Sequence, residues 1–185
     1  MKTKDSEKYA KILAAAKALI LRDGAATIST TKVAKAVGMA QSNLYIYFKN
    51  KDDLLRQLYV NAQTEVQQDF AKHVTPNADL TTAVPEYIDA MYAFASTHFD
   101  TFELLHQIKA LPNAEWTHTI TDAQNPAQMI QAAIDASILR PVSPAIIMAI
   151  IYNAIRQYVL GVQHGDQTDF DEVRELLLNG IMRRD

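Results

Sequence analysis

The stretch of sequence that decides the fold is GMAQSNLYIYFKNKD, residues 38 to 52. Its middle, Leu44 to Phe48, is rich in aromatic and β-branched side chains, which favour a strand by intrinsic propensity. Other segments carry apolar residues at helical spacing, as residues 9–20 do, where these side chains recur three and four positions apart. The stretch is therefore either a lone strand or a helix whose aromatic residues have another purpose.

Gly38 decides between these alternatives, because it fits the turn glycine of a helix-turn-helix motif. Ala34, four residues earlier, then lies where the two helices cross and where a larger side chain would clash. The fit predicts a first helix from Thr30 to Val37 and a second, the recognition helix, from Gln41 to about Tyr47. The residues predicted to pack the motif are Val33, Ala34, Val37, Gly38, Met39, Leu44, Tyr47 and Phe48.

A recognition helix lies in the major groove of DNA with its N-terminal residues at the base edges. In this chain those residues are Gln41, Ser42 and Asn43, and the amide groups of Gln and Asn can each form two hydrogen bonds with adenine. Hydroxyl and ammonium groups around them are placed to reach phosphates. The expected phosphate contacts are Thr30, Thr31, Tyr45, Tyr47, Lys49 and Lys51.

The charge and composition of the chain agree with this interpretation. Residues 1–60 hold 11 basic and 5 acidic side chains, a net charge of +6, whereas the other residues have a net charge of −9, which favours a polyanionic partner for the first segment alone. The chain has no cysteine, which excludes disulfides and cysteine metal sites and suits a reducing compartment. No secretory signal is visible, and the longest apolar run, residues 145–152, is far shorter than the ~20 residues of a membrane span. We therefore expect a cytoplasmic protein without a membrane partner.

The rest of the chain has the pattern of further helices. Asn50 and Asp53 resemble a capping box that opens a long helix over residues 51–73. The later segments with helical periodicity are 80–97, 100–110, 125–138, 144–163 and 169–183. The predicted fold is all-α: an N-terminal three-helix helix-turn-helix domain, residues 1–50, is joined by the long helix to an α-helical C-terminal domain, residues 51–185.

The segment 144–163 is apolar most of the way round a helix, so it must be covered on two sides. One side can be the core and the other a second copy of the chain, with the last helix completing a four-helix interface. The alternative is the central helix of a monomer. The residues predicted for the dimer interface are Ile147, Ile151, Ile155, Tyr158, Val173, Leu177 and Ile181.

Residues 24–55, GAATISTTKVAKAVGMAQSNLYIYFKNKDDLL, resemble the DNA-binding domain of the TetR/AcrR family of bacterial transcriptional regulators. The shared pattern includes the hydrophobe-Ala pair at 33–34, Ala-x-Gly-hydrophobe at 36–39, Leu-Tyr-x-Tyr-Phe at 44–48 and Lys-Asp-x-Leu at 51–54. The sequence departs from the pattern at Ala40, where the family often has a capping Ser, and at Ser42, where it has Gly or Ala. The resemblance implies phosphate contacts at Tyr45, Tyr47 and Lys51.

The resemblance also implies a function, which is that of a ligand-released homodimeric repressor of a pseudo-palindromic operator. The C-terminal domain would then bind an unknown small-molecule effector, and family effectors tend to be apolar or aromatic. The candidate pocket residues are Tyr92, Phe99, Phe102, His106, Trp116 and Tyr152. The alternative is a DNA-binding regulator that responds to no ligand.

A second class of function is a di-iron helical-bundle enzyme, because Glu103 and His106, and Glu115 and His118, both form Glu-x-x-His. The two motifs are only 12 residues apart with Pro112 between them, whereas the enzyme needs them on separate long helices. We therefore expect no catalytic residues, no metal site and no cofactor.

Overall fold

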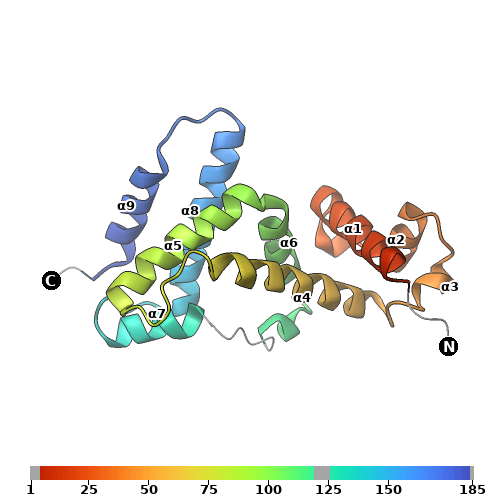
Figure 1. Ribbon diagram of the computed structural model, residues 1–185, viewed down its shortest axis with the longest axis horizontal. Coiled ribbons are helices and arrows are strands. Elements are labelled where there is room, and N and C mark those ends of the chain that lie inside the picture. Colours follow the sequence, from red (N-terminus) through yellow and green to blue (C-terminus); the bar gives the residue numbers. More distant parts are fainter. Residues whose placement is uncertain (1–4, 119–125, 184–185) are drawn as a thin grey trace. The chain divides into compact units, whose positions relative to one another are not determined.

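The structure is a computed structural model that describes residues 5–118 and 126–183, and it confirms the all-α fold. The only β-type pairing among these residues is an isolated bridge between Leu139 and Met182. Residues 44–48 are the end of a helix followed by a turn, so the strand suggested by their propensity does not form. The elements are α1 (Ser6–Asp23), η1 (Ala25–Thr27), α2 (Thr30–Ala36), α3 (Gln41–Leu44), α4 (Lys51–Phe70), α5 (Leu80–Thr97), α6 (Phe99–Lys109), η2 (Glu115–His118), α7 (Pro126–Asp135), α8 (Pro144–Gln163) and α9 (Phe170–Ile181) (Figure 1).

The chain folds into two compact units. Unit 1 contains the chain up to Glu65 and a second stretch that begins at Asp100, so it includes α1, α2, α3 and most of α4 and α6. Unit 2 contains Val66–Phe99 and the chain from α7 to α9. The domain boundary at residue 50 stays a prediction.

Unit 1 is built around the apolar faces of its helices. Asp5 caps α1 by accepting the backbone N–H groups of Glu7 and Lys8, and Gly24, with φ of +90°, ends the helix as predicted. The side chains of α1, α2 and α3 meet the first half of α4 in one core cluster. Its fully buried members include Ile12, Ile20, Val33, Leu44, Phe48, Leu54 and Tyr59.

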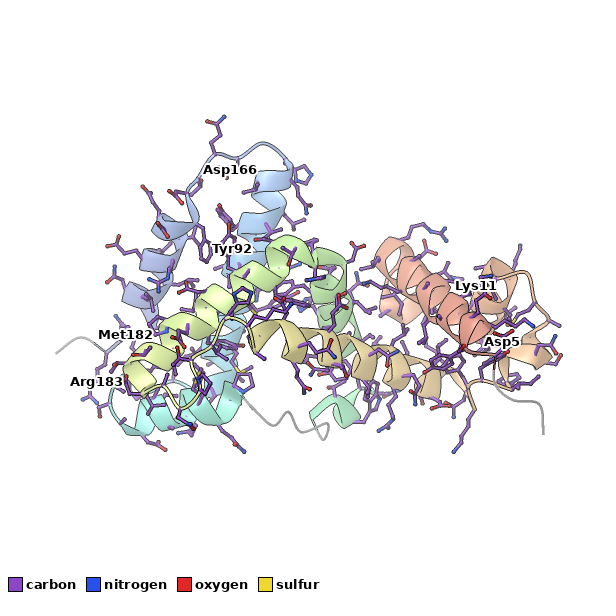
Figure 2. All side chains as sticks on the ribbon, viewed as in Figure 1. Asp5, Lys11, Tyr92, Asp166, Met182 and Arg183 are labelled. Atoms are coloured by element: carbon purple, nitrogen blue, oxygen red, sulfur yellow. The ribbon has the colours of Figure 1, made fainter. Side chains whose placement is uncertain are left out.

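In unit 2, α5 packs against α7, α8 and α9, and α8 packs against α7 and α9 (Figure 1). Arg174 of α9 forms a two-point ion pair with Asp89 of α5, at 2.5 and 2.9 Å. Tyr92 projects from α5 toward α9, where its ring stacks on Phe170 with centroids 3.6 Å apart (Figure 2). These contacts hold α9 on α5.

The predicted helix bounds agree for α5 and α8 and differ by a few residues elsewhere. The helix α7 stops at Asp135 rather than residue 138 because Ser137 has φ of +60°, which a right-handed helix does not allow. The helix α9 stops at Ile181 because Met182 is extended and pairs with Leu139. The first residue of the predicted segment 125–138 lies outside the described residues.

The predicted dimer interface needs correction. Ile147, Ile151, Ile155, Leu177 and Ile181 are each at most 5% exposed, so they belong to the core of the protomer itself. Helical periodicity identified the apolar rows of α8 but did not tell which row faces α5. The apolar side chains that stay exposed on these two helices are Ile146 (53%), Ile150 (46%), Val162 (46%) and Leu176 (74%).

By length and composition alone, α8 could cross a membrane, and it is the one helix in the described part of the chain that passes this test. Only 22% of its apolar window is buried within the protomer. The helix has a buried row, Ile147, Ile151, Ile155 and Val159, and it packs against α5, α7 and α9. Ile146 and Ile150, outside this row, stay exposed in the protomer.

Candidate DNA-binding surface

The turn between α2 and α3 has the geometry that the sequence predicts. Gly38 has φ of +68°, a left-handed conformation that glycine adopts without strain. The backbone N–H of Met39 donates to the carbonyl of Ala34 at 3.0 Å, and that of Gly38 donates to Lys35 at 3.2 Å. This pair of hydrogen bonds is a Schellman motif, which satisfies the last carbonyls of α2 and reverses the chain.

The predicted packing residues lie in or against the core cluster. Val33, Leu44 and Phe48 are fully buried, and Ala34 is 2% exposed. Val37, Met39 and Tyr47 are partly buried and pack against the same cluster. The ring of Tyr9, from α1, stacks on Phe48 at 5.3 Å, and its hydroxyl donates to Gln57 of α4 at 3.2 Å. Burial, with a smaller contribution from Asp53, raises the pKa of Tyr9.

The recognition helix α3 is shorter than predicted. It is α-helical only over Gln41–Leu44, and the N–H groups of Ile46 and Tyr47 bond carbonyls three residues back, which tightens its end. Ala40 occupies the N-cap position and supplies no side-chain hydrogen bond. The backbone carbonyl of Ala40 accepts from the N–H of Asn43 at 2.9 Å.

The three predicted base contacts differ in exposure. Ser42 and Asn43 are exposed, whereas Gln41 is half-buried and its side chain bonds within the protein. Its Nε2 donates to Thr30 Oγ1 at 2.9 Å and to the Tyr45 hydroxyl at 3.2 Å. Thr30 is only 9% exposed, so its prediction as a phosphate contact is corrected: the hydroxyl faces Gln41.

The other predicted phosphate contacts lie beside α3. Thr31 and Lys49 are exposed, and Tyr45 is 49% exposed. Lys51 is half-buried, with its Nζ 3.3 Å from the carbonyl of Ala26. Lys32 and Lys35, three residues apart on α2, are also exposed and were not among the predicted contacts.

The start of α4 is fixed by the two residues that resemble a capping box. Asn50 Oδ1 accepts the N–H of Asp53 at 2.8 Å, as expected. The Asp53 carboxylate accepts the N–H of Lys49 at 2.8 Å, one residue earlier than in the standard motif. These bonds hold the backbone around Lys49 and Lys51 next to α3.

A polar network that the sequence did not reveal connects three helices of unit 1. Thr101 of α6 is 2% exposed, and its hydroxyl accepts from Lys17 of α1 at 2.7 Å. The same hydroxyl donates to Glu65 of α4 at 2.9 Å. The three residues are far apart in sequence, so no local pattern brings them together.

The six candidate pocket residues divide between the units. Tyr92, Phe99 and Tyr152 belong to unit 2, and Phe102, His106 and Trp116 belong to unit 1. Trp116 packs edge-on against Tyr59 at 5.4 Å and lies under the guanidinium of Arg56 at 4.8 Å. Of the six, Trp116 lines a hollow of about 220 Å³, which also includes Lys51 and Leu111.

A second hollow, of about 160 Å³, lies beside the network and is lined by Lys17, Glu65 and Thr101 together with apolar residues. Both hollows are formed by unit 1 and are smaller than the ~300 Å³ at which pockets for small molecules begin.

The described residues contain no group of three or more His, Asp or Glu side chains that could hold a metal ion. Glu103 and His106, the first Glu-x-x-His, are both on α6. The side chains of Glu115 and His118, the second Glu-x-x-His, lie outside the part of the structure that is described.

Comparison with known proteins agrees with this geometry. Residues 12–58 match the family model of bacterial regulatory proteins, tetR family. A crystal structure of a protein from Lactobacillus plantarum, whose proposed role is transcription regulation, is 30% identical, with a TM-score of 0.78 over 96% of this chain and 99% of that one. A TetR-family transcriptional regulator from Haemophilus influenzae has the same fold, with 20% identity and a TM-score of 0.70 over 96% and 98% of the two chains.

Among curated relatives, the chain is 27% identical over 88 residues to the fatty acid metabolism regulator protein of Bacillus subtilis, which is 45% of each chain. It is also 27% identical over 114 residues to YvdT, an uncharacterized helix-turn-helix regulator of the same species, covering 62% of this chain and 59% of that protein. The matched segments thus span about half the length of these curated relatives. With its helix-turn-helix, its all-α fold and this similarity, the chain belongs to the TetR family of bacterial transcriptional regulators.

Proposed function

We propose that the protein is a sequence-specific regulator that binds a pseudo-palindromic operator as a homodimer. The observation that carries the proposal is the helix-turn-helix itself, with a left-handed glycine at the turn and Ser42 and Asn43 exposed on α3. In such a motif these side chains reach base edges in the major groove. Lys49, Lys51 and the hydroxyl of Tyr45 surround α3 and supply phosphate contacts that fix its position.

Fluorescence anisotropy tests this proposal with labelled DNA from upstream of the protein's own gene. At about 0.15 M salt we expect binding at least ~10³-fold tighter than to random DNA of the same length, which is the low end for specific regulators. Asn43→Ala should reduce that ratio, whereas Gln68→Ala, an exposed change on α4, should leave it unchanged. Equal affinity for both DNAs would contradict the proposal.

A homodimer is supported by the apolar side chains that α8 and α9 leave uncovered. Ile146 and Ile150 lie one turn apart on α8 and are about half exposed, and Leu176 of α9 is 74% exposed. Large apolar side chains left exposed on two helices that pack against each other favour a partner surface. A second copy fits because two recognition helices are needed to read two half-sites. Such a DNA-binding protein acts in the cytoplasm.

The second part of the proposal is a response to a ligand. An apolar effector would bind the protein and make it release the operator, so that the protein acts as a repressor. Release requires only that the effector binds the released conformation more tightly than the bound one. Because the Bacillus subtilis relative regulates fatty acid metabolism, a fatty acid is the first probe to test. The alternative is a DNA-binding regulator that responds to no ligand.

Operator release decides between these two candidates. The preformed complex is titrated with a medium-chain and a long-chain fatty acid below their critical micelle concentrations, with the corresponding alcohols as controls. A saturable loss of anisotropy that follows chain length supports an effector of this class. A complex that stays intact, with an unchanged melting temperature of the free protein, supports the regulator that responds to no fatty acid.

A further inference from the structure

The side chain of Gln41 is committed to contacts inside the protein. Its Nε2 donates to the hydroxyl oxygens of Thr30, at 2.9 Å, and of Tyr45, at 3.2 Å. Thr30 is 9% exposed, so one of these bonds lies in a nearly buried place. An amide nitrogen carries two N–H groups, and these two bonds therefore use both of its donors.

This arrangement conflicts with a role of Gln41 in reading bases. Glutamine recognises adenine by donating an N–H to N7 while its carbonyl oxygen accepts from the N6 amino group. Gln41 would have to break at least one of its bonds to do so, and breaking the bond to Thr30 would leave a nearly buried hydroxyl without that donor. Ser42 and Asn43, by contrast, are exposed on the same helix.

The bonds of Gln41 have a consequence for Tyr45. The Tyr45 side chain is 49% exposed, so its hydroxyl is held at the protein surface rather than in the core. Its oxygen accepts from Gln41 and can also accept from the Thr30 hydroxyl, and in that arrangement the Tyr45 O–H proton is left to donate to a phosphate oxygen. The oxygens of Thr30 and Tyr45 are 3.5 Å apart, so the three side chains form one compact cluster between α2 and α3.

We propose, on the basis of the DNA-binding function proposed above, that Gln41 is a positioning residue. It holds the Tyr45 hydroxyl for a DNA phosphate, and base discrimination by α3 rests on Ser42 and Asn43. Gln41 therefore affects affinity for all DNA through Tyr45 and does not set the preferred sequence.

Binding-site selection from a random DNA library tests the inference with the full-length protein. Gln41→Met keeps the length of the side chain and removes its donors. We expect it to select the same consensus as the wild type and to lose affinity for the selected site and for random DNA by the same factor, about 3- to 10-fold for a lost hydrogen bond. Asn43→Ala is the matched control and should change the consensus. The salt dependence of binding should stay the same for Gln41→Met, because a neutral hydroxyl releases no counterion.

A double-mutant cycle with Tyr45→Phe gives the sharper readout. If Gln41 acts through the Tyr45 hydroxyl, the double variant binds no more weakly than Tyr45→Phe alone. The inference is overturned if the two losses add in full, if Gln41→Met binds like the wild type, or if it changes the preferred base at any position. Circular dichroism checks that each variant is folded, and Gln41→Ala must select the same consensus as Gln41→Met. A wild-type protein that selects no consensus would instead refute the proposed function and this inference with it.

Discussion

Replacing Gly38 by alanine tests the turn on which the DNA-binding surface depends. Gly38 has φ of +68°, and no atom lies within 4 Å of the position that a Cβ would take. The cost of the substitution is therefore conformational rather than steric, about 1–2 kcal/mol for an L-residue in the left-handed region. Alanine also restricts the unfolded chain, which returns about 0.4–1 kcal/mol, so we expect a net loss of about 1 kcal/mol in the free energy of unfolding.

Two variants provide controls for Gly38→Ala. Gly38→Asn should cost less, because asparagine enters the left-handed region more readily. Gly180 lies in α9, where a Cβ would also have no atom within 4 Å, but its φ is not positive. Gly180→Ala should therefore raise the free energy of unfolding by about 0.5 kcal/mol. Urea denaturation followed by circular dichroism measures all three. If Gly38→Ala is as stable as the wild type, or shifts stability in the same direction as Gly180→Ala, the left-handed turn at Gly38 is refuted.

Three further predictions address the phosphate contacts, the dimer and the pH dependence. Lys51→Ala should reduce the slope of log K against log salt concentration by about 0.9 per protomer, the value for one phosphate contact, whereas Lys72→Ala should not change it. Equal slopes for the wild type and Lys51→Ala would exclude the contact. Ile150 is 46% exposed, and Ile150→Glu should weaken the dimer at least ~30-fold in sedimentation equilibrium, because each copy loses about 1 kcal/mol of apolar burial. Val60→Glu, a similar exposed change on α4, should leave the dimer constant unchanged. If Ile150→Glu also leaves it unchanged, the interface lies elsewhere. The Thr81 hydroxyl and the Thr82 N–H lower the pKa of Asp79, the cap of α5, below its ordinary 3.8, so the ionised cap stabilises the fold fully above that pH and loses its effect as the pH falls further. Asparagine at position 79 still caps the helix but does not titrate, so Asp79→Asn should lose less thermal stability between pH 5 and pH 3 than the wild type. An identical loss in both proteins would contradict this prediction.

The parts of the fold that sequence could predict are those set by local rules. The turn at Gly38, the end of α1 at Gly24 and the cap at Asn50 each depend on residues within a few positions of one another, and the structure has all three. The bounds of α5 and α8 follow from periodicity and from Pro144 at the first turn of α8. Strand propensity at residues 44–48 failed because burial of Leu44 and Phe48 against α1 and α4 outweighs it.

The parts that sequence could not predict depend on distant residues. Gln41 lies at the position on α3 predicted to read a base, and its hydrogen bond to Thr30, 11 residues earlier, could not be read from the local sequence. The hydrogen bond between Lys17 and Thr101 joins two residues that are 84 positions apart in the sequence. Periodicity found the apolar rows of α8, but which row faces the core is decided by how the helices pack, so Ile147, predicted for the dimer interface, is buried in the protomer, whereas Ile150 is 46% exposed.

The central claim is that α3 lies in the major groove of two half-sites, and site-directed cleavage tests it most directly. The chain has no cysteine, so Ala40→Cys, at the exposed start of α3, gives a single thiol to which an iron chelate that cuts DNA can be attached, and it leaves Ser42 and Asn43 in place. On the selected operator the structure predicts two short cleavage zones, one in each half-site, with centres about one helical turn, roughly 10 base pairs, apart or a multiple of that spacing. The same chelate on Glu172→Cys, exposed on α9, should produce no such zones. Cleavage spread evenly along the DNA, or equal patterns from the two variants, would contradict the account.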